Sequence, residues 1–492
     1  MYQTVSETVA ASKANTSPTL LRGLSLLDSV LLLVSGVIGS SVFLTANVTA
    51  SSLPNPVLFL LVWVFGGLIS LFACFAFAEL GSMFPQSGGQ YVYLREAYGP
   101  LPAFLYGWMI FAVSNGGTIA ALAVASATYL GKVIPTVSQE HVVFTVGWIV
   151  LTRAHIFALM SIGFVTFVNV AGLRRGAILQ NIATWAKFLA MAAFVLLGLT
   201  IGKGDWHHFA ARKLWDTGGL TTMGVGPLLS GVGIALIAVF WAYDGWVYIT
   251  WVGGEVKDSS RTVPRALVLG LLIVMGTYVA LNATYLYAMP LSEIAKHDTI
   301  AQAAAVVLFS PRAAVLLSVM IALSSFGAMA SCVMSGSRVY FAMARDGVFF
   351  HRMAEIHPKW RTPAFSLIGQ GIWAGVLAIS GRYDQLYTYV MFMMVLSYTL
   401  TVVALFVLRL KRPGLARSYR CTGYPWLPAI YVIVGTAWTL NTIRTRPLEA
   451  VTGSFIVLLG IPGYLYWKRA SQTALAGRTA SAQLEPTDTD QQ

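Results

Sequence analysis

The sequence contains about twelve apolar stretches, each long enough to cross a lipid bilayer as an α-helix, for which roughly 20 apolar residues suffice. Such runs predict helical membrane spans, because lipid cannot satisfy exposed backbone N–H and C=O groups. We place the stretches at residues 25–50, 57–84, 99–130, 155–172, 178–201, 226–253, 265–289, 313–342, 364–381, 384–409, 424–444 and 451–468.

The composition supports a membrane protein and excludes several other classes. Of the 492 residues, 57% are hydrophobic and 10% are charged, whereas soluble globular domains have about 25% charged residues. The net charge of +13 does not indicate nucleic-acid binding, because no basic cluster contains interleaved aromatic residues. Cys74, Cys332 and Cys421 lie far apart, and the 7 histidines are scattered. We therefore expect no metal site, no cofactor and no enzymatic activity.

Basic residues in the loops predict how the chain lies in the membrane. With the N-terminus placed inside, 21 of the 32 Lys and Arg residues fall on one side and 10 on the other, while Lys187 falls within a span. Cytoplasmic loops carry an excess of Lys and Arg. We therefore expect an integral protein of the cytoplasmic (inner) membrane with both termini in the cytoplasm.

Glycine and serine interrupt the first apolar stretch at residues 34–43 (VSGVIGSSVF). Glycine weakens a helix interior by about 1 kcal/mol relative to alanine. Unwound backbone at membrane depth is tolerated only where it is buried in protein or lines a cavity. Taken alone, the interruption predicts either a ligand site or close helix packing through small residues.

A similar interruption occurs in the sixth stretch, at residues 240–246 (FWAYDGW). Interrupted spans at corresponding positions of two five-span halves are typical of an inverted repeat with its binding site at the midplane. Helix packing alone would have to produce both interruptions by accident. We therefore favour a ligand site between the first and sixth spans.

The expected fold is an all-α polytopic membrane protein of about 12 transmembrane helices, arranged as a 5+5 inverted repeat with broken first and sixth spans. We divide the chain into a disordered cytoplasmic tail (1–24), a first repeat (25–201), a second repeat with its preceding extracellular loop (202–409), two further spans (410–468) and a second disordered cytoplasmic tail (469–492).

The broken spans suit a zwitterionic ligand, because a helix end leaves free amides or carbonyls that carry roughly half a charge. A break near Val37 leaves carbonyls on the inner half of span one and amides near Ser40 and Ser41 on the outer half. Span six offers carbonyls at Trp241 and Ala242. Amides would bind an α-carboxylate and carbonyls an α-ammonium, without any charged side chain.

Several short motifs together resemble the amino acid–polyamine–organocation (APC) superfamily, and within it the L-type amino acid transporter family. The resemblance runs from about Leu24 to Lys468, and one departure is Ser41, which replaces the last glycine of the family's Gly-Ser-Gly signature. The motifs are GSSVF (39–43), ELG (79–81), residues 85–93, the lysine of span five, AYDGW (242–246) with Gly254-Glu255, PRA (264–266), MARDG (343–347) and GYP (423–425).

The resemblance implies a leucine-transporter-like fold that works by alternating access. It also implies substrate-binding roles for Val37, Gly39, Ser40, Ser41, Trp241 and Ala242. The segments at 79–93 and 338–347 are interpreted as cytoplasmic gate and hinge elements, with ordinary interfacial loops as the alternative.

Asp244 and Lys187 lie deep within predicted spans, where ionisable residues are costly and often functional. Asp244 is interpreted first as a cap for the freed amides of Gly245, Trp246 and Val247, and second as a group that binds substrate or a coupling ion. For Lys187, the resemblance implies that it replaces a sodium ion and braces span one against span eight. The alternatives are that Lys187 extends to the cytoplasmic face or carries a transported proton.

Side chains opposite the backbone amides should set substrate specificity. Candidates are Ser114, Asn115 and Gly116 in span three and Tyr398 in span ten, and Trp241 is also a candidate outer gate. Packing is the alternative explanation for a tryptophan on a membrane helix.

These features predict sodium-independent transport of L-amino acids by alternating access, as exchange or facilitated diffusion. Proton-coupled amino acid symport is the alternative mechanism, and a transporter-like amino acid sensor is the alternative of another class. A channel is disfavoured, because no span presents a ring-forming charge pattern.

The expected partners are a small-molecule amino acid and the lipid bilayer, without nucleic acid. Animal members of the resembled family are often disulfide-linked to a heavy chain through the loop after span three, and residues 132–153 contain no cysteine. We therefore expect no disulfide-linked heavy chain.

Overall fold

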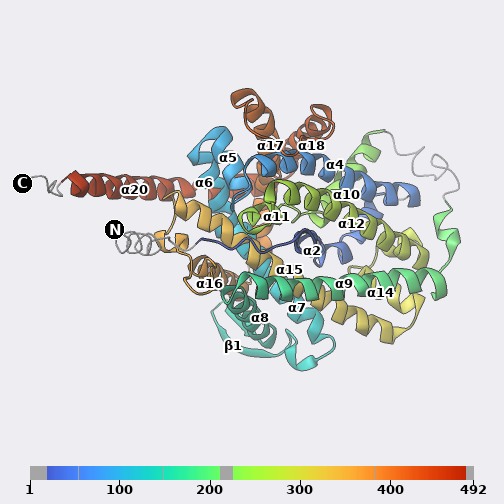
Figure 1. Ribbon diagram of the computed structural model, residues 1–492. Helices are drawn as coiled ribbons and strands as arrows, with labels where there is room; N and C mark the ends of the chain where they lie inside the picture. The colour runs from blue at the N-terminus through green and yellow to red at the C-terminus, as the bar shows by residue number, and fades with distance from the viewer. Residues whose placement is uncertain (1–18, 54, 148, 211–224, 382, 484–492) are drawn as a thin grey trace, which may run out of the picture.

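A computed structural model describes residues 19–53, 55–147, 149–210, 225–381 and 383–483 (Figure 1). Within these residues, 9 helices are long and apolar enough to cross a membrane, and three shorter apolar helices accompany them. The long helices are α4 (Pro56–Met83), the continuous run α6 (Pro100–Met109), η2 (Ile110–Ser114) and α7 (Asn115–Gly131), α8 (Arg153–Val170), α9 (Leu173–Ile201), α12 (Ser259–Ala288), α15 (Pro311–Arg345), α17 (Tyr383–Lys411), α18 (Trp426–Thr445), and the pair α19 (Pro447–Leu458) and α20 (Gly460–Gln483). The shorter apolar helices lie in α2 (Leu26–Val37), α10 (Val225–Ala242) and α16 (Ala364–Ser380).

Every predicted apolar stretch falls on these helices, which confirms a helical, polytopic membrane protein; the number of twelve crossings stays a prediction. Short helical segments connect them: η1 (Ser41–Phe43), α3 (Ala46–Ser52), α5 (Gln90–Tyr98), η3 (Pro135–Val137), η4 (Trp206–Phe209), α11 (Tyr248–Trp251), η5 (Gly253–Glu255), α13 (Leu291–Ile294), α14 (Ile300–Leu308) and η6 (His351–Ala354).

Local sequence signals explain where the first two spans begin. Ser25 and Asp28 form a capping box at the start of α2, in which each side chain accepts a hydrogen bond from the backbone amide of the other residue. Asn55 accepts hydrogen bonds from two amides at the start of α4, and Pro56 follows at the first helical position. Both are preferred helix-start residues.

Two features depart from the sequence-based expectation. The loop after α7 contains an antiparallel hairpin of β1 (Val142–Val146) and β2 (Ile149–Thr152), whose β-branched residues favour strands. At the other end, α20 continues to Gln483, although a disordered tail was expected from residue 469. This segment is rich in alanine, which has the highest helix propensity. Residues 1–18 and 484–492 of the expected tails lie outside the described residues.

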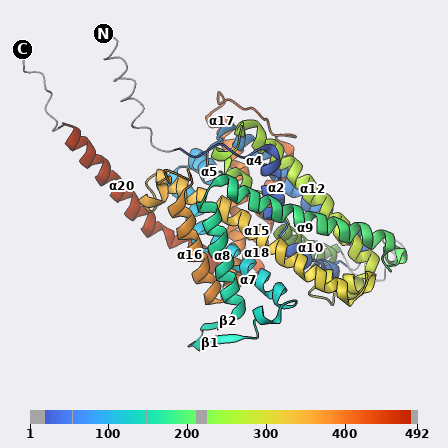
Figure 2. The same cartoon turned by 60° about the horizontal axis from the view of Figure 1, so that its bottom comes forward.

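The helices surround a central first span. In Figures 1 and 2, α2 lies in the middle of the molecule, and it packs against α9, α12 and α15. Figure 1 also shows α20 projecting from one end of the molecule, while α14 lies at the opposite end. We call these the α20 end and the α14 end.

On α9, polar side chains are on the buried side and large apolar side chains face outward. On α9, Ile182, Leu189 and Leu196 are 64%, 61% and 64% exposed, whereas Thr184 and Lys187 on the opposite side are fully buried. This pattern reverses that of a soluble protein and suits a lipid surface, because polar groups within a bilayer must find partners inside the protein.

Candidate functional site

The two interrupted helices meet at a pair of glycines. Regular helix ends at Val37 in α2 and at Ala242 in α10. A Cβ atom on Gly36 would lie 3.3 Å from the carbonyl oxygen of Gly245 and 2.6 Å from the ring of Tyr248. Gly245 has φ +105°, and a Cβ atom there would lie 2.6 Å from the carbonyl oxygen of Gly36. The interruptions predicted separately in sequence are therefore in direct backbone contact, and only glycine permits this approach.

A cavity of about 420 Å³ lies between the two breaks and α7. Its size falls within the range typical of small-molecule sites, about 300–1,000 Å³. The lining continues to Lys132, Gln139 and Thr299 at the α14 end. Predicted residues that line it are Val37, Gly39, Ser40, Ser41, Trp241 and Asp244.

Free backbone amides occur at the wall formed by the first break. No hydrogen bond among the described residues uses the N–H of Ser40 or Ser41. Their carbonyl oxygens are occupied, because Ser40 accepts from the Phe43 amide and Ser41 from the amides of Leu44 and Thr45. Two adjacent amides at the start of a helical segment can bind an anionic group such as a carboxylate.

The carbonyl ends of both broken helices converge on one tyrosine of α12. The Tyr278 hydroxyl lies 3.1 Å from the Val37 carbonyl oxygen and 2.9 Å from the Ala242 carbonyl oxygen. A phenol has one hydrogen to donate, so one of these carbonyls can accept a further donor from a ligand. Sequence reasoning missed Tyr278, because a single tyrosine in an apolar helix carries no distinguishing signal.

Lys187 is fully buried and binds the end of α2. Its Nζ donates to the carbonyl oxygens of Ser35 (2.9 Å) and Ile38 (2.6 Å). The hydroxyl of Ser324 on α15 lies 3.2 Å from the carbonyl oxygens of both Ile38 and Gly39. A cation at a helix C-terminus complements its unsatisfied carbonyls and its dipole. Lys187 therefore does not extend to the α20 end, and α9, α2 and α15 meet at this point.

Asp244 matches its preferred sequence interpretation as a helix cap only in part, because it binds one of the three amides expected, that of Gly245. The next helix, α11, begins at Tyr248, and its N-cap residue Val247 has no side-chain cap bond. The carboxylate of Asp244 instead accepts a 2.6 Å hydrogen bond from Tyr398 on α17 and a bond from the amide of Gly245. The positive φ of Gly245 turns the chain before a regular helix can start. Asp244 thus joins span six to span ten at the cavity wall.

The span-three candidates lie away from the cavity lining. Asn115 is buried, and its amide donates to Gln370 on α16 at 2.9 Å. Ser114 contacts the sulfur of Met394 on α17. Here the helix forms a single π-turn, η2, which shifts the following residues around the helix axis. Asn115 faces α16 and does not line the substrate cavity.

The α20 end is closed by a buried ion pair and backbone pairing. Arg338 on α15 binds both carboxylate oxygens of Glu255 at 2.6 Å and 2.9 Å, with the two side chains 1% and 0% exposed. The Glu255 carbonyl oxygen accepts the amides of Gly23 and Leu24, and Leu24 pairs with Val256 as a parallel bridge. The segment before span one, the segment after span six and span eight are thereby tied together.

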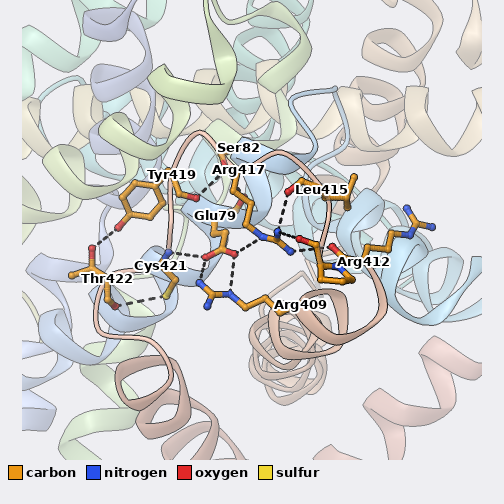
Figure 3. Close-up of polar contacts among 10 residues, drawn as sticks. Glu79, Ser82, Arg409, Arg412, Leu415, Arg417, Tyr419, Cys421 and Thr422 are labelled. Carbon is orange, nitrogen blue, oxygen red and sulfur yellow. Dashed lines mark hydrogen bonds and ion pairs between the residues drawn. The ribbon is translucent and has the colours of Figure 1, made fainter.

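A second buried carboxylate fastens the loop between α17 and α18. Glu79 on α4 is fully buried and binds Arg409 (3.0 and 2.5 Å), Arg417 (3.1 Å) and the amide of Cys421 (2.7 Å). Figure 3 shows these side chains converging on Glu79 from the loop that crosses it. The Arg409 guanidinium also lies 3.6 Å above the ring of Tyr424. The motifs at 79–81 and 423–425 therefore belong to one structural cluster.

Two broken apolar helices whose free ends line a central cavity define a membrane transport protein. The sequence matches the amino acid permease family over residues 24–463, and the chain belongs to that family. It is an APC-superfamily transporter resembling the L-type transporters, and not an enzyme.

Characterised relatives span nearly the whole chain. The chain is 29% identical to the serine/threonine exchanger SteT of Bacillus subtilis, with 91% of this chain and 97% of the relative covered. It is 26% identical to human b(0,+)-type amino acid transporter 1, with 90% of this chain and 87% of the relative covered. It is 27% identical to human large neutral amino acids transporter small subunit 2, with 89% and 79% covered.

Proposed function

We propose that the protein carries L-amino acids across the cytoplasmic membrane by alternating access, without sodium, as an exchanger or facilitator. The observation that carries this proposal is the pair of unused amides at Ser40 and Ser41 beside a cavity of about 420 Å³. These amides bind the α-carboxylate. The α-ammonium binds the carbonyl of Ala242, or shares the Val37 carbonyl, which also accepts the Gly39 amide at 2.9 Å.

Sodium independence is supported by the position of Lys187. Its ammonium already occupies the carbonyls of Ser35 and Ile38 at the end of α2, where a bound sodium ion would compete for the same oxygens. Lys187 thereby supplies a positive charge at the position where a sodium ion would otherwise bind. Transport therefore needs no sodium gradient.

Exchange is supported by the SteT relative, whose name describes an exchanger. Proton symport is the second candidate, and a specific observation favours it: Asp244 lies at the cavity wall and shares a hydrogen bond with Tyr398, so its carboxylate could be protonated and released during the cycle. Only one of these mechanisms depends on a pH gradient.

The orientation proposal follows the charge distribution. The α14 end is outside, and the α20 end, with its basic loops, is in the cytoplasm. The cavity is then open toward the outside and closed toward the cytoplasm through Glu255 and Arg338.

We also propose that the protein acts without a disulfide-linked heavy chain, because Cys74, Cys332 and Cys421 are all buried. Isolation of an obligatory disulfide-linked complex would contradict this.

The proposed mechanism is tested by labelled amino acid uptake into proteoliposomes containing the purified full-length chain. An exchanger should require internal amino acid for uptake, whereas a facilitator should take up label into empty vesicles only down the inward substrate gradient; in both cases uptake should be the same with sodium or choline outside. Concentrative uptake into empty vesicles that depends on an imposed pH gradient and is abolished by a protonophore would establish proton symport instead. Binding without any flux would favour a sensor.

A further inference from the structure

The mouth of the cavity carries the ammonium group of Lys132. Lys132 and Asp244 are the charged residues among the described residues that line the cavity. Asp244 lies at the wall near the breaks and is held by Tyr398. Lys132 lies at the α14 end, just after α7 ends at Gly131, and no ion pair involves it in the described part of the chain.

Neighbouring residues hold the Lys132 ammonium in place across the mouth. Its Nζ donates to Oε1 of Gln302 at 3.0 Å and lies 4.9 Å above the ring of Tyr129. The amide nitrogen of Gln302 donates to Ser318 on α15 at 2.5 Å. This second bond orients Gln302, so its oxygen faces Lys132. Residues of α7, α14 and α15 therefore position the Lys132 ammonium at the entrance of the cavity.

From this geometry we propose that Lys132 is a specificity-determining residue that excludes amino acids with cationic side chains. The inference rests on the proposed amino acid transport and names its substrate class, which is neutral amino acids. A neutral amino acid is a zwitterion without net charge, and its carboxylate is attracted to Lys132. A dibasic amino acid brings a second ammonium past Lys132, within the screening length of about 8 Å at physiological salt.

The anionic group deeper in the cavity is Asp244, which lies near the breaks and already has two hydrogen-bond donors. The carboxylate of Asp244 accepts bonds from Tyr398 and Gly245. The other polar lining side chains are the hydroxyl groups of serine, threonine and tyrosine, one glutamine amide and one tryptophan indole. A dibasic substrate therefore has to pass Lys132 at the mouth before its distal ammonium can approach Asp244.

The test compares norleucine with lysine, which has the same carbon chain and an added ε-ammonium. Both compete with a labelled neutral amino acid for uptake into proteoliposomes. In the unmodified chain, lysine should compete at least about tenfold more weakly than norleucine, a ratio equivalent to about 1.4 kcal/mol. In Lys132→Gln the ratio should shrink about tenfold, and Lys132→Glu should shrink it further.

Two more variants keep the outcome decisive. Thr299→Glu adds a carboxylate at the mouth without altering Lys132, so it should also improve lysine competition, even if the Lys132 variants fold poorly. Lys296→Gln is the matched control, because Lys296 is exposed, pairs with Glu293 and does not line the cavity. An unchanged lysine-to-norleucine ratio in Lys132→Gln, Lys132→Glu and Thr299→Glu would overturn the inference. Absence of any neutral amino acid uptake in the unmodified chain would instead contradict the proposed function.

Discussion

At the scale of single residues, the site depends on backbone groups that a few side chains keep available. Ser40 and Ser41 contribute amides, the carbonyls of Val37 and Ala242 share the single hydroxyl hydrogen of Tyr278, and Lys187 neutralises the end of α2. A charged amino acid can thus be held in a core that has little charge of its own, since helix ends supply the complementary partial charges.

Replacing Ser40 or Ser41 by leucine tests the amide pair. The bulky side chain should prevent the carboxylate from approaching amides worth about 1.5–3 kcal/mol per charged hydrogen bond, so affinity should fall at least tenfold while expression is retained. Binding is measured directly on purified protein, for example by scintillation proximity. Ser51→Leu is the control, because Ser51 is exposed on α3. Unchanged affinity in both site variants would show that span one does not bind the carboxylate.

Lys187→Ala should affect the transport cycle more than substrate binding. The substitution leaves the carbonyls of Ser35 and Ile38 without their donor and loosens the junction of α9 with α2. We expect uptake to fall at least about tenfold, the equivalent of roughly 1.4 kcal/mol, while the dissociation constant changes much less. Lys203→Ala is the control, because Lys203 is exposed just beyond the end of α9. Normal uptake by Lys187→Ala would refute this role.

At the scale of secondary-structure elements, buried carboxylates hold segments that local sequence would not bring together. Glu79 binds two arginines from the chain between α17 and α18, and Glu255 binds Arg338 on α15. Buried ions are costly when they lose a partner, because the remaining charge stays desolvated.

Glu79→Gln should lower the stability of the folded protein. The variant leaves Arg409 and Arg417 without their shared anion, and breaking a buried ion pair typically costs about 3–5 kcal/mol. The midpoint of thermal unfolding of the purified protein in detergent should drop clearly. The matched control is Glu96→Gln, since Glu96 pairs with Arg412 at the partly exposed surface, where such pairs contribute about 1 kcal/mol or less. Equal midpoints for the two variants would show that the Glu79 cluster is not needed for stability.

At the scale of the whole molecule, the structure is closed at the α20 end and has a cavity that reaches the α14 end. Alternating access requires the closed end to open. The contacts between Glu255 and Arg338, and between Glu255 and residues 23–24, lie where such opening would separate the chain.

Glu255→Gln should shift the equilibrium away from this conformation. A cysteine introduced by Thr118→Cys in the cavity lining should react with an impermeant maleimide from outside, over a low background, because the three native cysteines are buried. Adding Glu255→Gln weakens the closure of the α20 end and should slow external labelling severalfold. Glu96→Gln in the same background should not. A labelling rate that stays the same, in protein that elutes as a folded species, would contradict a gating role.

The sequence by itself determined the membrane class, the positions of the apolar helices and the two interruptions, because these depend on local hydrophobicity and on glycine. The sequence also identified Lys187 as a candidate functional residue, because a charged side chain within an apolar span is energetically costly and often functional. The family match over residues 24–463 agrees with the resemblance that the short motifs predicted.

Only the tertiary structure decided which groups meet. Asn115, just after the π-turn η2, bonds to Gln370, Asp244 bonds to Tyr398, and Tyr278 reaches both broken helices from α12. Lys132 acquires its place at the mouth through Gln302, which lies 170 positions later in the chain. Sequence periodicity carries no information about such contacts, because they depend on how distant helices pack and on small departures from ideal helix geometry.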